Sequence, residues 1–178
     1  EPKGILFLCV ANSARSQIAE GLARELAPAG VRVQSAGSSP TGVRPEALEV
    51  LSEIGIDASE QRSKAVTEID PATVDTVITL CGEEECPIFL GDAIRVHWGL
   101  PDPAAVKEDG EARLEAFREV RDELHRRLSV IFPAPSSDEA GSVRKRVSSF
   151  YARSIEGGDG CCGKAGLPRG VLAEMAGY

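Results

Sequence analysis

The sequence predicts an α/β fold in three layers (α/β/α), with a parallel sheet of about four strands between layers of helices. Short apolar segments rich in β-branched residues alternate along the chain with segments of helical periodicity. A strand followed by a helix and a further strand implies a right-handed crossover, and therefore a parallel sheet. At 178 residues and 42% hydrophobic residues, the chain is long enough for one ordinary domain with a packed core.

The first half of the domain is expected to begin strand–helix–strand. The apolar residues 5–10 predict a strand, and residues 16–26, with Ile18, Leu22 and Leu26 four positions apart, predict a helix. Residues 31–35 predict the second strand.

The second half continues the alternation. Pro45 is expected to open a helix that ends at Gly55. Residues 74–80 and 93–98 predict two further buried strands, and apolar residues on one face predict a long helix over residues 111–132.

A Pro/Ser/Gly-rich segment, residues 133–141, interrupts the pattern and has the composition of a linker. We therefore expect the domain to span residues 1–133 and a linker with a C-terminal tail to span residues 134–178. The tail contains apolar residues at helical spacing, followed by the glycine-flanked pair Cys161 and Cys162.

Composition excludes several classes of partner. The net charge of −8 argues against nucleic acid and against an anionic membrane, since both require a basic face. No apolar run approaches the roughly 18 residues of a membrane span. Five cysteines, an odd number without a recognisable secretory signal, favour a reducing cytoplasm and reactive thiols over a disulfide framework. We expect a cytoplasmic monomer.

Residues 9–16, between the first strand and the first helix, carry the strongest functional signal. The small residues after Cys9 let several backbone N–H groups converge on one point at a helix N-terminus; these residues are Val10, Ala11, Asn12, Ser13 and Ala14. Arg15 adds a planar fork that matches two oxygens of an anion, and the same positive field favours a thiolate at Cys9. The alternative is a buried structural cysteine beside a surface arginine.

This loop resembles the phosphate-binding loop of low-molecular-weight protein tyrosine phosphatases and of their relatives, the thioredoxin-coupled arsenate reductases. The resemblance covers residues 4–132. It implies that Cys9 attacks the anion, that Arg15 binds it, and that Ser16 hydrogen-bonds the thiolate.

Asp102 lies between two prolines, just after a predicted strand. A rigid turn at this end of the sheet suits a general acid, although aspartate beside proline is also common in turns that have no catalytic role. The resemblance implies the acid role. Where the phosphatases carry an aromatic residue after the Asp-Pro pair, this chain has Ala104, which argues against an aryl phosphate substrate.

Cys81 and Cys86 flank a short acidic segment after the third predicted strand. By themselves they could be buried small hydrophobes or half of a zinc site, although zinc would need two more ligands. The segment resembles the redox cysteine pair of the thioredoxin-coupled arsenate reductases. This implies a relay in which Cys81 attacks Cys9 and Cys86 then attacks Cys81, with thioredoxin as the reductant.

The resemblance also concerns a cation site beside the loop. Some of these reductases surround a potassium ion with an asparagine, a glutamate, a serine and an aspartate, and the first three match Asn12, Glu20 and Ser35. The fourth falls on Lys64, whose ammonium could replace the metal. We therefore expect no metal and no cofactor. The alternative is that Lys64 is a surface cation.

The tail resembles the start of arsenite S-adenosylmethionine methyltransferases, and the adjacent thiols of Cys161 and Cys162 are candidates for binding trivalent arsenic. A disordered tail is the alternative.

We therefore expect reduction of arsenate to arsenite, with phosphate or sulfate as competing anions. A low-molecular-weight phosphatase and a non-catalytic arsenic-binding protein are the competing hypotheses. The sequence leaves open whether thioredoxin, mycothiol or glutathione is the reductant.

Overall fold

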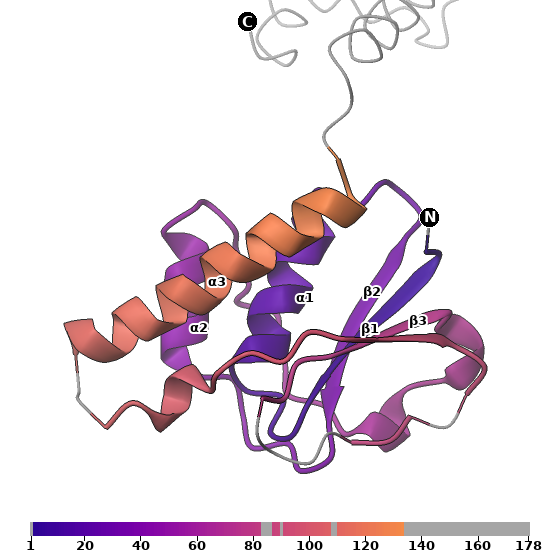
Figure 1. Ribbon diagram of the computed structural model, residues 1–178, viewed down its shortest axis with the longest axis horizontal. Coiled ribbons are helices and arrows are strands. Elements are labelled where there is room, and N and C mark those ends of the chain that lie inside the picture. Colours follow the sequence, from indigo (N-terminus) through magenta and orange to yellow (C-terminus); the bar gives the residue numbers. More distant parts are fainter. Residues whose placement is uncertain (1, 83–86, 90, 108–109, 134–178) are drawn as a thin grey trace, which may run out of the picture. The chain divides into compact units, whose positions relative to one another are not determined.

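The computed structural model describes residues 2–82, 87–89, 91–107 and 110–133 (Figure 1). The chain divides into two units, Glu1–Ala134 and Pro135–Tyr178, and all described residues belong to the first. The predicted helical segment of the tail, its two cysteines, and Cys86 lie outside the described residues.

The centre of the first unit is a four-stranded parallel sheet in the order β2-β1-β3-β4. Its strands are β1 (Gly4–Cys9), β2 (Arg32–Gly37), β3 (Thr76–Thr79) and β4 (Ile94–His97). All six residues of β1 are buried, because this strand has a neighbour on each side and packing on both faces. The strand order reverses beside β1, and in open parallel sheets ligands bind at the carboxyl ends of the strands at this point.

The three α-helices among the described residues gather on one face of the sheet, as Figure 1 shows. They are α1 (Arg15–Leu26), α2 (Pro45–Ser52) and α3 (Glu111–Ile131). The apolar stripe of each helix meets the inward side chains of the strands, so that Phe7 and Ile78 pack in one core with residues such as Ile18, Leu51 and Leu124.

The opposite face is covered by a thinner layer. Leu6, Leu8, Val77 and Phe89 form a second core beneath short 3-10 helices, of which η1 spans Val66–Glu68 and η2 spans Pro71–Thr73. A third 3-10 helix, η3 (Pro103–Ala105), follows β4. The predicted α/β fold with a four-stranded parallel sheet is confirmed, and one of its outer layers is built from 3-10 turns rather than α-helices.

The predicted strands and helices occur where expected, with ends that differ by up to three residues. The prediction that the last strand is buried is wrong, because β4 is exposed along its whole length and Ile94 is 70% exposed. β4 is the edge strand next to β3. Helix α1 packs instead on β1 and β2, which lie toward the opposite edge of the sheet. Among the described residues, no helix is both long and apolar enough to cross a membrane.

Candidate active site

Residues 9–16, which we call the anion loop, lead from the carboxyl end of β1 into α1. Outside donors hold the loop's backbone carbonyls: Ser39 N donates to Val10 O at 2.9 Å, Thr41 N to Ala11 O at 3.2 Å, and Arg44 N to Ser13 O at 2.9 Å. In a trans peptide the N–H points away from the C=O. Because the carbonyls are held outward, the following N–H groups point toward the inside of the loop, as an oxyanion requires.

Gly37 at the end of β2 allows the loop to pass close to the sheet. A Cβ at this position would lie 2.4 Å from Val10 O and 2.8 Å from Asn12 N. Contacts this short do not occur for real side chains, so any other residue would displace the loop. The last residue of β2 is thus part of the scaffold of the anion loop.

Cys9 is 2% exposed, and its Sγ lies 2.8 Å from Ser16 Oγ. Asn12 N donates to the same Sγ at 3.2 Å. Asn12 Nδ2 donates to Ser16 Oγ at 2.9 Å, which leaves the Ser16 hydroxyl proton to be donated to the sulfur. The sulfur of Cys9 is therefore held by two hydrogen-bonding partners, the Ser16 hydroxyl and the backbone N–H of Asn12.

Asn12 holds the loop in a conformation that few residues adopt. Its φ of 46° lies in the left-handed region, where asparagine is one of the few tolerated side chains. Besides its contact with Ser16, the amide donates to Ser35 Oγ at 2.8 Å and accepts from Lys64 N at 2.7 Å. Because these partners fix the amide, they also fix the direction of the backbone at Asn12.

Arg15 joins the loop to the segment after β4. Its guanidinium is buried, Nη1 donates to Leu100 O at 3.1 Å, and Nη2 lies 3.7 Å from Asp102 Oδ1. Asp102 caps η3 by accepting from Ala104 N at 3.3 Å, and its side chain is 35% exposed. The structure thus brings the predicted anion-binding cation and the predicted acid together.

Cys81 lies two residues after the end of β3 and is fully buried. Leu80 N donates to Leu8 O at 2.8 Å, so β1 and β3 remain hydrogen-bonded up to the residues that precede Cys81 and Cys9. The two cysteines leave adjacent strands at the same edge of the sheet, and neither is in a disulfide among the described residues. The next residue, Gly82, lies close to Leu100 O, which also accepts the hydrogen bond from Arg15. A Cβ added at Gly82 would lie 2.8 Å from this oxygen.

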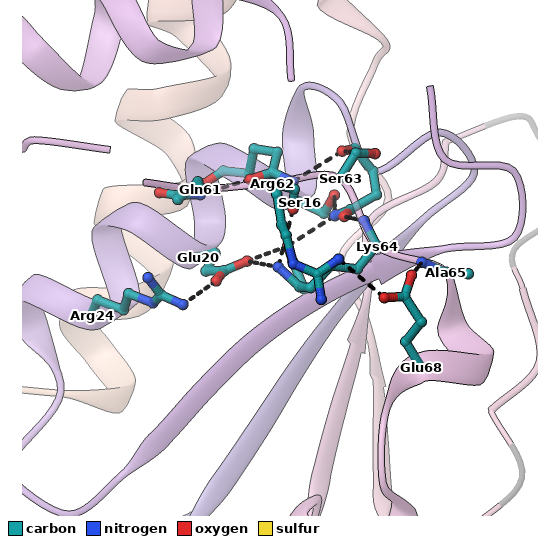
Figure 2. A network of polar contacts seen from close by, with 12 residues as sticks. Ser16, Glu20, Arg24, Gln61, Arg62, Ser63, Lys64, Ala65 and Glu68 are labelled. Carbon is teal, nitrogen blue, oxygen red and sulfur yellow. Dashed lines mark hydrogen bonds and ion pairs between the residues drawn. The ribbon is translucent and has the colours of Figure 1, made fainter. Parts of the chain in front are cut away.

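A second polar cluster lies behind the loop (Figure 2). Glu20 is fully buried and accepts hydrogen bonds from Ser35 Oγ and Arg24 Nη2. Lys64 Nζ lies 3.2 Å from the Glu20 carboxylate and donates to Arg62 O at 3.1 Å. The ammonium of Lys64 thus contacts Glu20, one of the three residues that match potassium ligands in the arsenate reductases that this chain resembles. Within the part of the chain that the structure describes, no group of three or more His, Cys, Asp and Glu side chains is placed to hold a metal.

The structure brings Cys9, Arg15, Ser16 and Asp102 together at the carboxyl edge of the sheet and places Cys81 after the neighbouring strand. The sequence reasoning missed the residues that support the loop from outside. Among them are Gln17 and Ser63, which both donate to Asn12 O, at 3.0 and 2.9 Å. Backbone carbonyls such as Asn12 O and Leu100 O have no signature in a sequence, so their donors could not be found there.

Comparisons with known proteins point to one family. The family model of the low molecular weight phosphotyrosine protein phosphatases matches residues 4–145. An arsenate reductase of Halalkalibacterium halodurans is 42% identical over 128 residues, which make up 71% of this chain and 92% of that protein.

Solved structures agree with this. An arsenate reductase in its phosphate-binding state superimposes with a TM-score of 0.60 at 34% identity, over 73% of this chain and 96% of the other. A thioredoxin-dependent arsenate reductase of Corynebacterium glutamicum gives a TM-score of 0.52 at 30% identity, over 72% of this chain and 61% of that one.

Proposed function

The chain belongs to the low molecular weight phosphotyrosine protein phosphatase family, and on that premise we propose that it is an arsenate reductase that works through a relay of three cysteines and is regenerated by thioredoxin. The observation that carries the proposal is a pair of buried cysteines at adjacent strands: Cys9 is the last residue of β1, and Cys81 lies two residues after the end of β3. A phosphatase needs a thiolate beside an anion pocket, whereas a second thiol at the same sheet edge supports a reduction.

The first step forms a covalent adduct. The Cys9 thiolate attacks arsenate, an S–As bond forms, and one As–O bond breaks. Arg15 and the inward N–H groups of the anion loop bind the remaining oxygens. The leaving oxygen departs as water after it takes protons from solvent and from Asp102, whose carboxyl group lies 3.7 Å from Arg15.

The second step transfers two electrons. The Cys81 thiolate attacks Sγ of Cys9, so an S–S bond forms and the S–As bond breaks. The bonding pair stays on arsenic, which leaves as arsenite, and the oxidised product is a Cys9–Cys81 disulfide. The Cys86 thiolate then attacks Sγ of Cys81 and releases the Cys9 thiolate. Thioredoxin's dithiol reduces the Cys81–Cys86 disulfide, which restores the two electrons.

The relatives support thioredoxin as the reductant, since one solved relative is thioredoxin-dependent. The relay also requires Cys9 and Cys81 as thiols at the start of each cycle. A reducing cytoplasm is therefore the location that we propose.

The test is arsenate-dependent oxidation of NADPH in the presence of thioredoxin and thioredoxin reductase. The wild type should turn over, whereas Cys9→Ser, Cys81→Ser and Cys86→Ser should each stop steady-state turnover by removing a sulfur that the relay uses. Cys161→Ser/Cys162→Ser, which removes two thiols outside the relay, is the matched control and should keep full activity.

A single turnover without thioredoxin separates the roles of the two relay partners. Cys86→Ser should release one equivalent of arsenite and leave a Cys9–Cys81 disulfide, whereas Cys81→Ser should release none. Mass spectrometry of the quenched protein reads both outcomes. Hydrolysis of p-nitrophenyl phosphate at a steady rate in Cys81→Ser, without arsenate reduction in the wild type, would instead support the phosphatase hypothesis.

A further inference from the structure

Gln17 is a buried amide that no step of the proposed mechanism uses. It is the third residue of α1 and is fully buried. Its Nε2 donates to Asn12 O and to Arg62 O, both at 3.0 Å, and its Oε1 accepts from Gln61 Nε2 at 2.8 Å. A buried side chain with every polar hydrogen and one acceptor oxygen engaged is strongly oriented.

Two of the three partners of Gln17, Gln61 and Arg62, belong to residues 61–64, which we call the bracing segment. In Figure 2 the labelled residues Gln61, Arg62, Ser63 and Lys64 lie together next to Ser16. Ser63 Oγ lies 2.9 Å from Asn12 O and 3.1 Å from Ala11 O, so its single proton is donated to the nearer Asn12 O or shared between the two carbonyls. Asn12 O is therefore held from two sides, by an amide on α1 and by a hydroxyl on the bracing segment.

The direction of Asn12 O decides what the next N–H group does. Across the trans peptide between Asn12 and Ser13, the N–H of Ser13 points opposite to Asn12 O. While both donors hold the carbonyl outward, the Ser13 N–H faces the inside of the anion loop. If the peptide rotated, a carbonyl oxygen would face the bound anion in place of a donor, and the pocket would lose affinity for oxyanions.

The other loop peptides are held in a different way. Val10 O and Ser13 O accept from backbone N–H groups of residues 39 and 44, and Ala11 O has both a backbone donor and Ser63. The donors to Asn12 O, in contrast, are the side chains of Gln17 and Ser63. Substitution of these two side chains would therefore remove the hydrogen bonds that orient the Asn12–Ser13 peptide.

We propose that Gln17 is a positioning residue of the anion pocket: together with Ser63, it fixes the Asn12–Ser13 peptide so that the Ser13 N–H donates to the bound oxyanion. The inference rests on the proposed function in taking the ligand to be a tetrahedral oxyanion, and inorganic phosphate serves as a probe that is not reduced. Gln17 acts on the anion only through the peptide and touches no reacting atom.

The test is a titration of the reduced full-length protein with inorganic phosphate, followed by the amide resonances in ¹H–¹⁵N spectra. In the wild type, the Ser13 amide proton should shift downfield as phosphate binds. Gln17→Met keeps the volume of the side chain and removes its donors, and Ser63→Ala removes the second donor at a half-buried position. Each should raise the phosphate Kd by about threefold, since the other donor still holds the peptide.

The double variant Gln17→Met/Ser63→Ala should raise the Kd by about thirtyfold, more than the product of the two single effects, because only then can the peptide rotate. The downfield shift at Ser13 should be lost. Gln34→Met is the matched control, because Gln34 also donates between two segments, to Thr73 Oγ1 at 3.1 Å, away from the loop. It should leave the Kd and the Ser13 shift unchanged.

A purely structural role of Gln17 predicts a different result, in which the melting temperature of the double variant falls while Kd and the Ser13 shift stay at wild-type values. That result would overturn the inference, and Ser63→Ala alone keeps the test available if Gln17→Met does not fold. If the wild type reduces arsenate but its Ser13 amide does not respond to phosphate, the inference fails and the proposed function stands. If the Ser13 response is present but arsenate is not reduced, the proposed function fails and the inference stands.

Discussion

A single guanidinium connects three parts of the candidate site. Arg15 belongs to the anion loop, donates to Leu100 O, and lies beside Asp102. With 4% exposure its position is set by packing as well as by charge. A lysine would keep the charge but offers one ammonium in place of a planar fork, so it could not hold the carbonyl and grip two oxygens of an anion together. The requirement at this position is therefore geometric.

Lys64 places an ammonium beside a buried carboxylate. The side chain is 13% exposed, and Nζ pairs at 3.2 Å with a carboxylate that is fully buried. A buried carboxylate requires a positive partner, and Glu20 obtains one from Lys64 and another from Arg24. A resident ammonium does not depend on the concentration of any ion.

We predict that potassium neither raises the melting temperature nor tightens anion binding. Melting curves in sodium chloride and in potassium chloride at equal ionic strength should coincide, because stabilisation by a bound ion would follow its concentration. Lys64→Met should lower the stability by about 2 kcal/mol in either salt, since the buried carboxylate loses a partner. A melting temperature that rises in potassium alone would contradict the prediction.

At the scale of residues, the sequence predicts contacts between side chains that lie close together along the chain. Cys9, Arg15 and Ser16 fall within eight consecutive positions, so their meeting follows from one turn between a strand and a helix. Ser63 donates to Asn12 O across 51 positions, and that contact depends on how residues 61–64 cross the loop. No periodicity in the sequence encodes such a crossing.

At the scale of elements, periodicity predicts the strands and helices well because most of them bury one defined face. Periodicity predicts less well which elements lie next to one another in the fold. β4 is apolar enough to be expected in the core, yet its edge position leaves Ile94 and Val96 exposed. Short 3-10 helices such as η1 and η2 have no apolar stripe long enough to be recognised, and the layer that they form could not be foreseen.

The contact between α2 and α3 has an electrostatic part that follows from the end of α2. Glu53 is the C-cap of α2, where a negative charge is unfavourable to the helix dipole. Two arginines of α3 offset this: Arg118 Nη2 donates to Glu53 at 2.7 Å, and Arg121 Nη1 donates to Glu53 at 2.7 Å and to Val50 O at 3.0 Å. The hydrogen bonds from Arg118, and then those from Arg121, lower the pKa of the Glu53 carboxyl below its usual value of 4.5.

This predicts a pH-dependent effect of Glu53→Gln. A carboxyl whose pKa is lower in the folded than in the unfolded state stabilises the fold above the unfolded-state pKa, and the contribution is lost as pH falls. Glu53→Gln should therefore lower the melting temperature at pH 7, and the difference from wild type should shrink below about pH 4.5. Glu49→Gln, on an exposed position of the same helix, is the control. A difference that stays constant from pH 7 to about pH 3.5 would show that the ion pairs contribute nothing.

At the scale of the whole molecule, an acidic protein binds an anion. The net charge of −8 repels an oxyanion at long range, and salt screens that repulsion beyond about 10 Å. Binding must therefore depend on groups within the pocket, namely Arg15 and the inward N–H groups. These groups belong to residues 9–16, which the sequence marks clearly. For this reason anion binding could be predicted although the net charge of the chain is unfavourable to it.

The extent of the family match predicts which part of the chain is needed. The match to the relative from Halalkalibacterium halodurans spans 128 residues, which are 71% of this chain and 92% of that protein. That arsenate reductase is therefore not much longer than the matched part of this chain. All candidate catalytic residues, Cys86 included, precede residue 104. The two tail cysteines, Cys161 and Cys162, lie beyond both the predicted domain end at residue 133 and the family match, which ends at residue 145.

We therefore predict that a truncated chain of residues 1–133 keeps kcat and the KM for arsenate within about twofold of the full chain, because it retains every group that the relay uses and the helix that completes the core. A chain of residues 1–145 should behave in the same way, and Cys161→Ser/Cys162→Ser tests the thiols with the rest of the tail in place. Coupled NADPH oxidation measures all three. If residues 1–133 fold with the full melting transition but have lost turnover while residues 1–145 retain it, the catalytic unit extends past the linker. If both truncations and the cysteine variant are inactive, the tail thiols take part in arsenic chemistry, and a relay confined to Cys9, Cys81 and Cys86 is wrong.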